Sequence, residues 1–443
     1  MDDKIKKKLL YSWITNINFY EGLPFDPYPI SLRTVNIIKW LLDNKIKDKI
    51  IIDSLVLQSR FLSNRLEKHL LANHYFSNAK ALFFIGIYLN SKEADKWHKK
   101  GKKIILEQIE EQILDDGAHF ELSPMYHNLF IQDILDLLII NKGNHEKFDK
   151  FFEENLIEKL KKMIYWAKTM SHPDGEVPFF NDSGINVAPR IDDLQRFAIE
   201  NFSIPKFEKK QVIYHQPSNY FVMDMQQYKA ILDIAEIGAN YNPGHAHADT
   251  LSFELSIGGN RAIINSGIST YENTSLRHFQ RSTAAHSTVE VADKNSSDVW
   301  GSFRVGNRAS TFDVQIQKNK ESTLVSASHD GYKDFHGCIH KRSWYFEKNL
   351  IRVRDTLKGN NVKSSGRLFL HPKVQLKEII NNIIFLSMPT GTFKISIINN
   401  DFKLIQSNYY KSFGFSENNA CILVDIKNNI SEIEIEILNK DKT

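Results

Sequence analysis

The spacing of apolar residues changes near residue 204, and this change constrains the fold more than any other feature of the chain. Before it, apolar residues recur at helical spacing, as in residues 31–42, where a serine stands in the N-cap position. Further stretches share this pattern, namely residues 51–70, 79–89, 94–114, 126–140 and 148–170. Short polar links between helices of this length are typical of antiparallel neighbours.

After residue 204 the pattern is that of short strands. Segments such as residues 220–224, 251–257 and 288–291 are rich in β-branched and aromatic residues, and turn residues separate them at regular intervals. This arrangement is typical of an all-β sandwich. The sequence therefore predicts an α+β multidomain chain, with a helical domain over residues 1–204 and an antiparallel β-sandwich over residues 205–443.

Charge and cysteine content exclude several classes of protein. The formal net charge is only +4 over 443 residues, so the charge balance does not favour nucleic acid as a partner. Cys338 and Cys421 are too few for a cysteine zinc cluster or a disulfide framework. The longest apolar run, residues 131–140, contains Asp133 and Asp136 and is shorter than the roughly 20 residues of a membrane helix.

The segment from Asn242 to Asp249, with the sequence NPGHAHAD, carries the densest group of chemically active side chains. In extended chain His245, His247 and Asp249 would lie on one face, because side chains alternate across a strand. The preceding proline and glycine form a turn signal, so the histidines are expected to enter a strand from a loop. A structural role is the alternative for an isolated pair of histidines.

A third histidine follows in a second β-rich stretch. His286 lies in the sequence RSTAAHSTV, and a turn at residues 265–267 separates it from the first pair. Imidazoles from separate strands are the usual way to build a zinc site in proteins. The three histidines are therefore a candidate metal site or acid-base cluster.

Two stretches of the helical part contain residues suited to chemistry. Asn73 and His74 lie in ANHYFSNA at a predicted helix start, and Tyr126 lies in DGAHFELSPMYH, which passes from a loop into the next helix. Taken singly, each stretch is more typical of helix capping and core packing than of a functional site. Together with the histidines of the β part, they favour a functional site.

The order of these motifs resembles the heparinase II/III-like family of polysaccharide lyases, in particular members found with bacterial surface-polysaccharide genes. The matching segments, PYPISLR, ANHYFSNAKAL, DGAHFELSPMYH, HPDGEVPFFNDSG, PGHAHADTLSFEL, RSTAAHSTVEV and DVWGSFRV, lie between residues 27 and 305. The resemblance implies an α/α toroid followed by an antiparallel β-sandwich. The helical part is short for a full toroid, so an incomplete toroid is expected.

The resemblance also implies cleavage of a glycosidic bond next to a uronic acid by β-elimination, which is the activity of a carbon-oxygen lyase acting on polysaccharides. Asn73 resembles the residue that binds the uronate carboxylate, and Tyr126 resembles the tyrosine that exchanges protons with the sugar. A phenol has an ordinary pKa of about 10, so it needs a neighbouring positive charge or hydrogen-bond donor to act near neutral pH. His74 and His245 are predicted to supply that charge, or one of them is the base itself.

Other residues are predicted to bind the substrate or a metal. The expected contacts to an acidic polysaccharide or oligosaccharide are Arg277, Arg281, Arg304, Glu121 and His127, with structural roles as the alternative for the arginines. His247 and His286 resemble two of three metal ligands in relatives, whereas Asn265 stands where those relatives have aspartate. Asp249 could replace that ligand around one structural divalent ion, Zn or Ca, or the histidines could form a hydrogen-bonded scaffold without metal.

Two other functions remain open on these residues. One is a non-catalytic glycan-binding or surface-polysaccharide assembly protein on the same scaffold, and the other is a metal-dependent glycan hydrolase. The basic N-terminus has no apolar segment behind it, so no signal peptide is visible and a cytoplasmic location is expected. Family members are often periplasmic or secreted.

Overall fold

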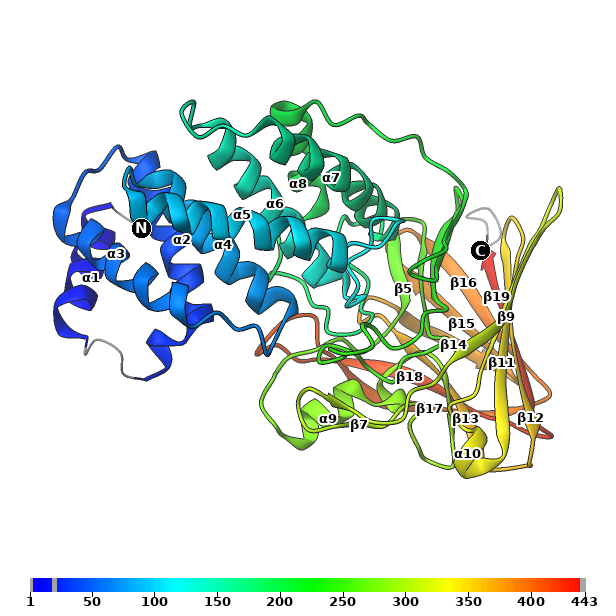
Figure 1. Cartoon of the computed structure of the whole chain (residues 1–443). Coiled ribbons are helices and arrows are strands. Elements are labelled where there is room, and N and C mark those ends of the chain that lie inside the picture. The colour runs from blue at the N-terminus through cyan, green and yellow to red at the C-terminus, as the bar shows by residue number, and fades with distance from the viewer. Residues whose placement is uncertain (1–2, 18–21, 439–443) are drawn as a thin grey trace. The chain divides into compact units, whose positions relative to one another are not determined.

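The computed structural model describes residues 3–17 and 22–438, which divide into two compact units (Figure 1). The first unit contains residues 1–113 and 132–160, and the second contains residues 114–131 and 161–443. Residues 114–131 and 161–204 belong to the same compact unit as the strands, and the domain boundary at residue 204 stays a prediction. These segments carry many of the loop residues that form the site described below.

Helices form the first unit, and their ends follow ordinary capping rules. Asp48 accepts hydrogen bonds from the first turn of its helix, and Ser91 accepts one from Ala94 N–H. The helices are α1 (Asp3–Asn16), η1 (Leu23–Phe25), α2 (Pro27–Asp43), α3 (Lys49–Asn64), α4 (Ala72–Tyr88), α5 (Lys92–Gln112), and parts of α6 (Pro124–Lys142) and α7 (Lys150–Met170). Helix α8 (Ile191–Phe202) belongs to the second unit.

Helix α4 is the centre of the first unit. All its residues from Phe76 to Ile87 are buried, and it packs against α2 and α5. Its buried Lys80 lies 2.6 Å from carboxylate oxygens of both Asp133 and Asp136 on α6. This pairing explains why two aspartates interrupt the apolar run of residues 131–140, since they neutralise a buried ammonium.

Two antiparallel sheets form most of the second unit. A nine-stranded sheet has the order β1 (Val212–His215), β2 (Tyr220–Asp224), β3 (Tyr228–Asp233), β4 (Phe253–Ile257), β5 (Asn260–Ile264), β13 (Ser364–Leu370), β18 (Glu417–Asp425) and β17 (Asp401–Tyr409), with β6 (Val289–Val291) also paired to β13. An eight-stranded sheet has the order β14 (Gln375–Ile380), β15 (Ile383–Met388), β16 (Gly391–Ile398), β19 (Ile430–Leu438), β12 (Leu350–Gly359), β11 (Cys338–Phe346), β10 (Thr323–His329) and β9 (Thr311–Lys318).

The core of the second unit lies between these sheets. Side chains such as Phe221 and Leu232 from one sheet form a single buried cluster with Trp344 and Ile435 from the other. Burial alternates along strands such as β11, where every second residue faces the core. Helices followed by antiparallel sheets are the fold class predicted from the sequence, and the prediction is confirmed.

Short elements connect these strands around the site. They are α9 (Ser275–Arg281), η2 (Thr283–Ala285), the hairpin of β7 (Val299–Trp300) and β8 (Arg304–Val305), and α10 (Lys333–His336). The histidine motif was expected to enter a strand, but residues 242–252 form an irregular loop and β4 begins only at Phe253. The motif is therefore held by side-chain hydrogen bonds rather than by a sheet ladder.

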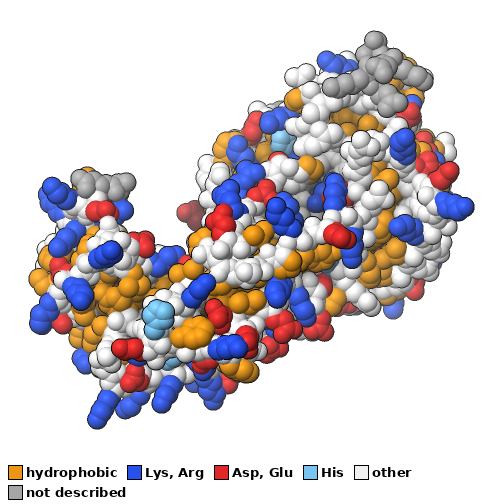
Figure 2. Space-filling view, turned by 90° about the horizontal axis from the view of Figure 1, so that it is seen from above, with side chains coloured by type: hydrophobic (Ala, Val, Ile, Leu, Met, Phe, Trp, Pro, Cys, Tyr) orange, Lys and Arg blue, Asp and Glu red, His pale blue; other side chains and the backbone are white. Residues whose placement is uncertain are grey.

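The surface carries both signs of charge. On the face seen in Figure 2, Lys and Arg side chains are interspersed with Asp and Glu side chains, in keeping with the formal net charge of +4. Within the described part of the chain, no helix combines the length and the apolar character needed to cross a membrane.

Candidate active site

Tyr126 and His245 stack face to face in the second unit. Their ring centroids lie 3.9 Å apart with an angle of 30° between the planes. Tyr126 is in the first turn of α6, where Pro124 occupies the first helical position. The Ser123 hydroxyl accepts a hydrogen bond from Tyr126 N–H at 3.2 Å and donates one to the carbonyl of Asp182 at 2.6 Å. The helix start is thus tied to the loop that also holds His245.

Tyr271 completes this aromatic group. Its hydroxyl oxygen lies 3.1 Å from that of Tyr126, and its ring contacts the rings of Phe303 and Phe413. Burial, followed by the charge of Asp182, holds the pKa of Tyr271 well above its ordinary value. Tyr271 therefore keeps its proton and can donate it in a hydrogen bond to the oxygen of Tyr126.

Asp182 is the buried anion at the centre of the site. Its carboxylate accepts hydrogen bonds from His245 Nδ1 at 3.0 Å and from His247 Nε2 at 2.8 Å, and it forms a two-pronged pair with the guanidinium of Arg277. Burial alone would raise the pKa of Asp182, but Arg277 and the two histidines outweigh it and hold that pKa well below its ordinary value.

The carboxylate also fixes the state of His245. With Nδ1–H donated to Asp182, Nε2 is left without a hydrogen bond to any described residue. Burial lowers the pKa of His245, yet the charge of Glu121 and the hydrogen bond to Asp182 outweigh it, so the net shift is upward. The protonated imidazole is therefore more stable beside the Tyr126 ring than it would be in an isolated histidine.

The predicted sugar contacts divide into buried and exposed residues. Arg277 and Arg281 are 0% exposed; Arg277 also donates to the carbonyl of Ser302, and Arg281 donates to the carbonyls of Ala246, Trp300 and Gly301. Both side chains support the loops of the site, and their contact with sugar stays a prediction. Arg304 on β8 is exposed and remains a candidate for that contact.

His127 and Glu121 are also interior residues. His127 Nδ1 accepts a hydrogen bond from His119 N–H at 3.1 Å, and its Nε2 donates to the carbonyl of Met163 at 2.9 Å. Both ring nitrogens of His127 thus bind backbone groups. Glu121 is 3% exposed and acts on His245 through its charge. The contacts of both residues with sugar stay predictions.

The predicted metal ligands lie together. Ligand atoms of His247, Asp249 and His286 are all within 4.8 Å of one another, and all three side chains are buried. Asn265, which stands where relatives have aspartate, instead accepts a hydrogen bond from Ser287 N–H at 2.8 Å. Asp249 therefore offers the carboxylate that Asn265 lacks.

The hydrogen bonds of His247 and His286 leave one nitrogen of each ring available to bind a metal ion. His247 Nε2 faces the Asp182 carboxylate and His286 Nδ1 faces the carbonyl of Ser282 at 2.7 Å, so both nitrogens must carry hydrogen. The remaining nitrogens, His247 Nδ1 and His286 Nε2, then present lone pairs to each other at 3.1 Å. Burial lowers the pKa of His247 to about 4, which disfavours a shared proton. The donor set suits a borderline ion such as Zn²⁺.

Asn73 and His74 belong to the first unit and lie in the first turn of α4. His74 Nδ1 is 3.1 Å from a carboxylate oxygen of Glu67, and its ring stacks on Tyr28 with centroids 4.4 Å apart. The amide of Asn73 makes no hydrogen bond to a described residue and is partly exposed at the positive end of the helix. These features suit it to an anionic group.

The sequence reasoning missed Asp182 and Tyr271. Asp182 lies in HPDGEVPFFNDSG, a segment that resembles the family, and it follows Asn181, which has a positive φ of 53°. An Asn-Asp pair in a loop was a usable signal, because asparagine tolerates this conformation. Tyr271 had no signal of its own, because nothing in its local pattern separates it from a packing aromatic residue.

Comparison with known proteins gives matches along both parts of the chain. The family model described as heparinase II/III N-terminus matches residues 50–203, and the model described as heparinase II/III-like, C-terminal, matches residues 210–431. A heparin-sulfate lyase of Pedobacter heparinus is 26% identical over 247 residues, covering 49% of this chain and 35% of its own length. One from Bacteroides stercoris is 24% identical, covering 69% of this chain and 46% of its own length.

The chain thus spans less than half the length of these curated relatives. A crystal structure of heparinase III has a TM-score of 0.79 at 17% identity, covering 99% of this chain and 74% of that one. This likeness concerns the fold, and it confirms the predicted class of an incomplete α/α toroid followed by an antiparallel β-sandwich. Since the two matched regions account for most of its residues, the chain belongs to the heparinase II/III-like family.

Proposed function

We propose that the protein is a polysaccharide lyase that cleaves a uronic-acid-containing acidic polysaccharide by β-elimination. The observation that supports this most directly is the stacking of Tyr126 on His245, with the Tyr271 hydroxyl against the Tyr126 hydroxyl. A phenol between a cationic ring and a protonated donor is the arrangement that stabilises a phenolate. The similar proteins of Pedobacter heparinus and Bacteroides stercoris are named heparin-sulfate lyases, and on this basis we propose a glycosaminoglycan-like substrate for the protein.

In the proposed reaction Tyr126 exchanges protons with the sugar. Its phenolate removes the proton at C5 of the uronate, and the electron pair of that bond forms the C4–C5 double bond. The C4–O4 bond breaks, and the leaving oxygen takes the proton from Tyr126. His245 and Tyr271 stabilise the phenolate before the transfer, while Asp182 holds His245 in place.

The carboxylate of the uronate must be neutralised for its C5 proton to become acidic. We propose Asn73 for this task, because its amide donors stand at the positive end of α4 without a described partner. His74, oriented by Glu67, is proposed as a second hydrogen-bond donor for the same anion. Arg304 is proposed as a further contact to acidic sugar units, since its side chain is exposed.

A divalent ion, where bound, would be held by His247, Asp249 and His286. It would brace the loop of residues 242–252 against the segment that carries His286, and it would supply structural rather than catalytic chemistry. The catalytic residues proposed above act without it. His245 lies two residues before His247 in the same loop. Its Nδ1 faces Asp182, and its Nε2 is proposed to face the substrate.

The experiment that tests the function is a screen of acidic polysaccharides, including heparan sulfate, chondroitin sulfate, polygalacturonate and alginate, with ultraviolet and mass analysis of the products. A lyase gives a shorter chain that ends in an unsaturated uronate and gains ultraviolet absorbance. Products that have gained water instead would favour a glycan hydrolase. Binding without any product would favour a glycan-binding or assembly protein.

Replacing Tyr126 by phenylalanine should remove turnover while sparing substrate affinity. Because one group gives and takes the proton, we expect kcat to fall by roughly a thousandfold or more, with Kd for the substrate changed less than about twofold. Tyr271→Phe should cost about a hundredfold, because only a donor to the phenolate is lost. The control is Tyr214→Phe on β1. It removes one hydroxyl, which donates a hydrogen bond to the Asn219 side chain, and should leave kcat unchanged. Undiminished turnover in Tyr126→Phe would contradict the mechanism.

Glu121→Gln should shift the pH dependence of the reaction. The charge of Glu121 raises the pKa of His245, and the proposed active form carries His245 as a cation. Activity is therefore present below that pKa and lost as pH rises through it. Removing the charge lowers the pKa of His245, so the loss of activity should move to lower pH. The kcat/KM profile and an NMR titration of His245 measure the shift. The exposed Glu272, changed to Gln, is the control, and a shift to higher pH would refute the charge assignment.

The role of Asn73 predicts a graded response to substitution. Asn73→Ala removes the donors and should cost about 2 to 4 kcal/mol of transition-state stabilisation. Asn73→Asp keeps the shape but places a negative charge beside the uronate carboxylate, so its loss should be larger. The control Asn64→Ala removes another amide at a helix end and should have no effect on kcat/KM. An effect of Asn73→Ala confined to KM would show uniform binding instead.

The metal proposal predicts about one equivalent of divalent ion per chain after purification without chelators. His286→Ala should lose that ion and lower the midpoint of thermal unfolding, and chelation of the unaltered protein should have the same effect. Elemental analysis and calorimetry measure both. A protein that takes up no ion after exposure to zinc or calcium would favour the hydrogen-bonded scaffold.

A further inference from the structure

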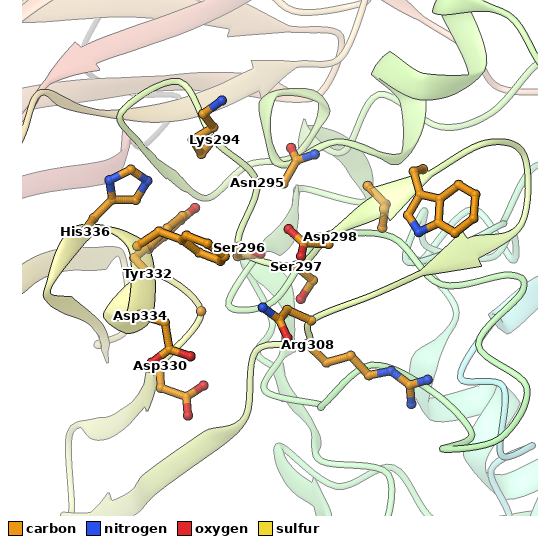
Figure 3. Close-up of a pocket in the computed structure, with 15 residues that line it drawn as sticks. Lys294, Asn295, Ser296, Ser297, Asp298, Arg308, Asp330, Tyr332, Asp334 and His336 are labelled. Atoms are coloured by element: carbon orange, nitrogen blue, oxygen red, sulfur yellow. The ribbon is translucent and has the colours of Figure 1, made fainter.

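A second pocket lies in the unit of the sheets, outside the group of Tyr126, His245 and Tyr271. It has a volume of about 620 Å³ and is formed by the segment after β6, the start of the β7–β8 hairpin, and the residues around α10. Figure 3 shows Ser297 and Asp298 on one side of this pocket, with Tyr332 and His336 on another. Its volume falls within the range usual for small-molecule sites.

The walls of this pocket offer unused polar groups and exposed rings. The carboxylates of Asp298 and Asp334 and the ammonium of Lys294 make no hydrogen bond or ion pair with a described residue. Trp300 is 60% exposed and Phe335 is 69% exposed. Aromatic side chains are enriched at binding interfaces, and two of them flank this pocket beside hydrogen-bonding groups that have no described partner.

The floor of the pocket is rigid. The Tyr332 hydroxyl donates to the carbonyl of Val289 at 2.8 Å, and the Ser297 hydroxyl accepts from Ala309 N–H at 2.9 Å. Gly331 lies so close to the Ser296 carbonyl that a Cβ atom there would approach the oxygen to 2.2 Å. Gly331 therefore allows these two walls to approach closely, and the hydrogen bonds hold the pocket in shape without a ligand.

The hairpin that walls the pocket also walls the candidate active site. At its pocket end it carries Asp298 and Trp300, and at its other end the Phe303 ring lies 5.9 Å from the ring of His245. Arg281 holds the carbonyl of Trp300, and Arg277 holds the carbonyl of Ser302 at 2.9 Å. One short segment thus lies between the two sites and is fixed by the arginines that support the first.

We propose that this pocket binds a sugar unit of the same glycan that carries no anionic group, either a neutral hexose or an amino sugar. The lining contains three carboxylates, on Asp298, Asp330 and Asp334, against the cations of Lys294 and Arg308, and Arg308 already donates to the carbonyl of Asn240. Such a lining disfavours a uronate or a sulfate. Carboxylates accept hydrogen bonds from sugar hydroxyls or an amine, and the apolar face of a pyranose can stack on an aromatic ring.

The choice of a glycan as ligand rests on the proposed function, but the test needs no turnover. Four tetrasaccharides serve as probes: cellotetraose, N-acetylchitotetraose, the glucosamine tetramer and tetragalacturonate. Binding to the full chain is measured by calorimetry and by saturation-transfer NMR. We expect at least one of the first three to bind, and Trp300→Ala and Asp298→Ala each to weaken it by about tenfold or more.

Two further variants separate this pocket from the rest of the protein. Tyr126→Phe should bind the same probe as the unaltered chain, because the tyrosine is not part of the pocket. Phe151→Ala removes a ring that is 65% exposed on α7 and is the match for Phe335→Ala, which should weaken binding. Equal binding by Phe335→Ala and Phe151→Ala, with Trp300→Ala also unaffected, would overturn the proposal.

The remaining outcomes also decide the question. No binding of any uncharged or amino probe at millimolar concentration would overturn the proposal, even in a protein that proves to be an active lyase. Tighter binding of tetragalacturonate, weakened by Trp300→Ala, would overturn the charge assignment. Binding by a protein without lyase activity would support the pocket while the proposed reaction fails.

Discussion

The buried carboxylate of Asp182 is the group on which the rest of the site depends. An isolated buried anion is costly, and this one is offset by Arg277 and by hydrogen bonds from His245 and His247. Each partner is thereby fixed in direction: His245 presents Nε2 outward, His247 turns Nδ1 toward His286, and Arg277 reaches the hairpin. Removing the anion would leave a buried guanidinium unpaired, so the loops of the site are held by electrostatics rather than by sheet pairing.

Burial determines the direction of the pKa shift of Tyr271, whereas nearby negative charge determines that of His245. Burial raises the pKa of Tyr271 and keeps its proton available, whereas the charges of Glu121 and Asp182 overcome burial at His245 and favour the cation. Tyr126 lies between these two environments. In the proposed reaction Tyr126 alternates between phenolate and phenol. Both neighbours would then lower the free energy of the phenolate more than that of the neutral phenol.

The sequence was informative where local periodicity decides structure. The change from helix to strand near residue 204 and the placing of Tyr126 at a helix start follow from apolar spacing and capping. The boundary between compact units does not follow from it, because residues 114–131 and 161–204 are helical or irregular yet pack with the sheets. The burial of side chains does not follow from the sequence either. Arg277, Arg281 and His127 are residue types that often bind sugars, but their partners here are backbone groups and, for Arg277, the carboxylate of Asp182. Asp182 could be located by motif but not by role, since its role exists only when His245, His247 and Arg277 converge.

The β7–β8 hairpin is also held by the ion pair of Asp182 and Arg277. Arg277 bridges Asp182 and the carbonyl of Ser302, so the anion that orients His245 also anchors the far side of the hairpin. A polysaccharide is longer than a single catalytic group, and binding energy from remote sugar units helps to position the scissile bond. In the proposed function, a segment that Asp182 fixes through Arg277 and that carries the exposed Trp300 would help to align both parts of such a substrate. Specificity for the sugar sequence would then come from the contrast between a cationic site at His245 and a carboxylate-rich pocket at Asp298 and Asp334.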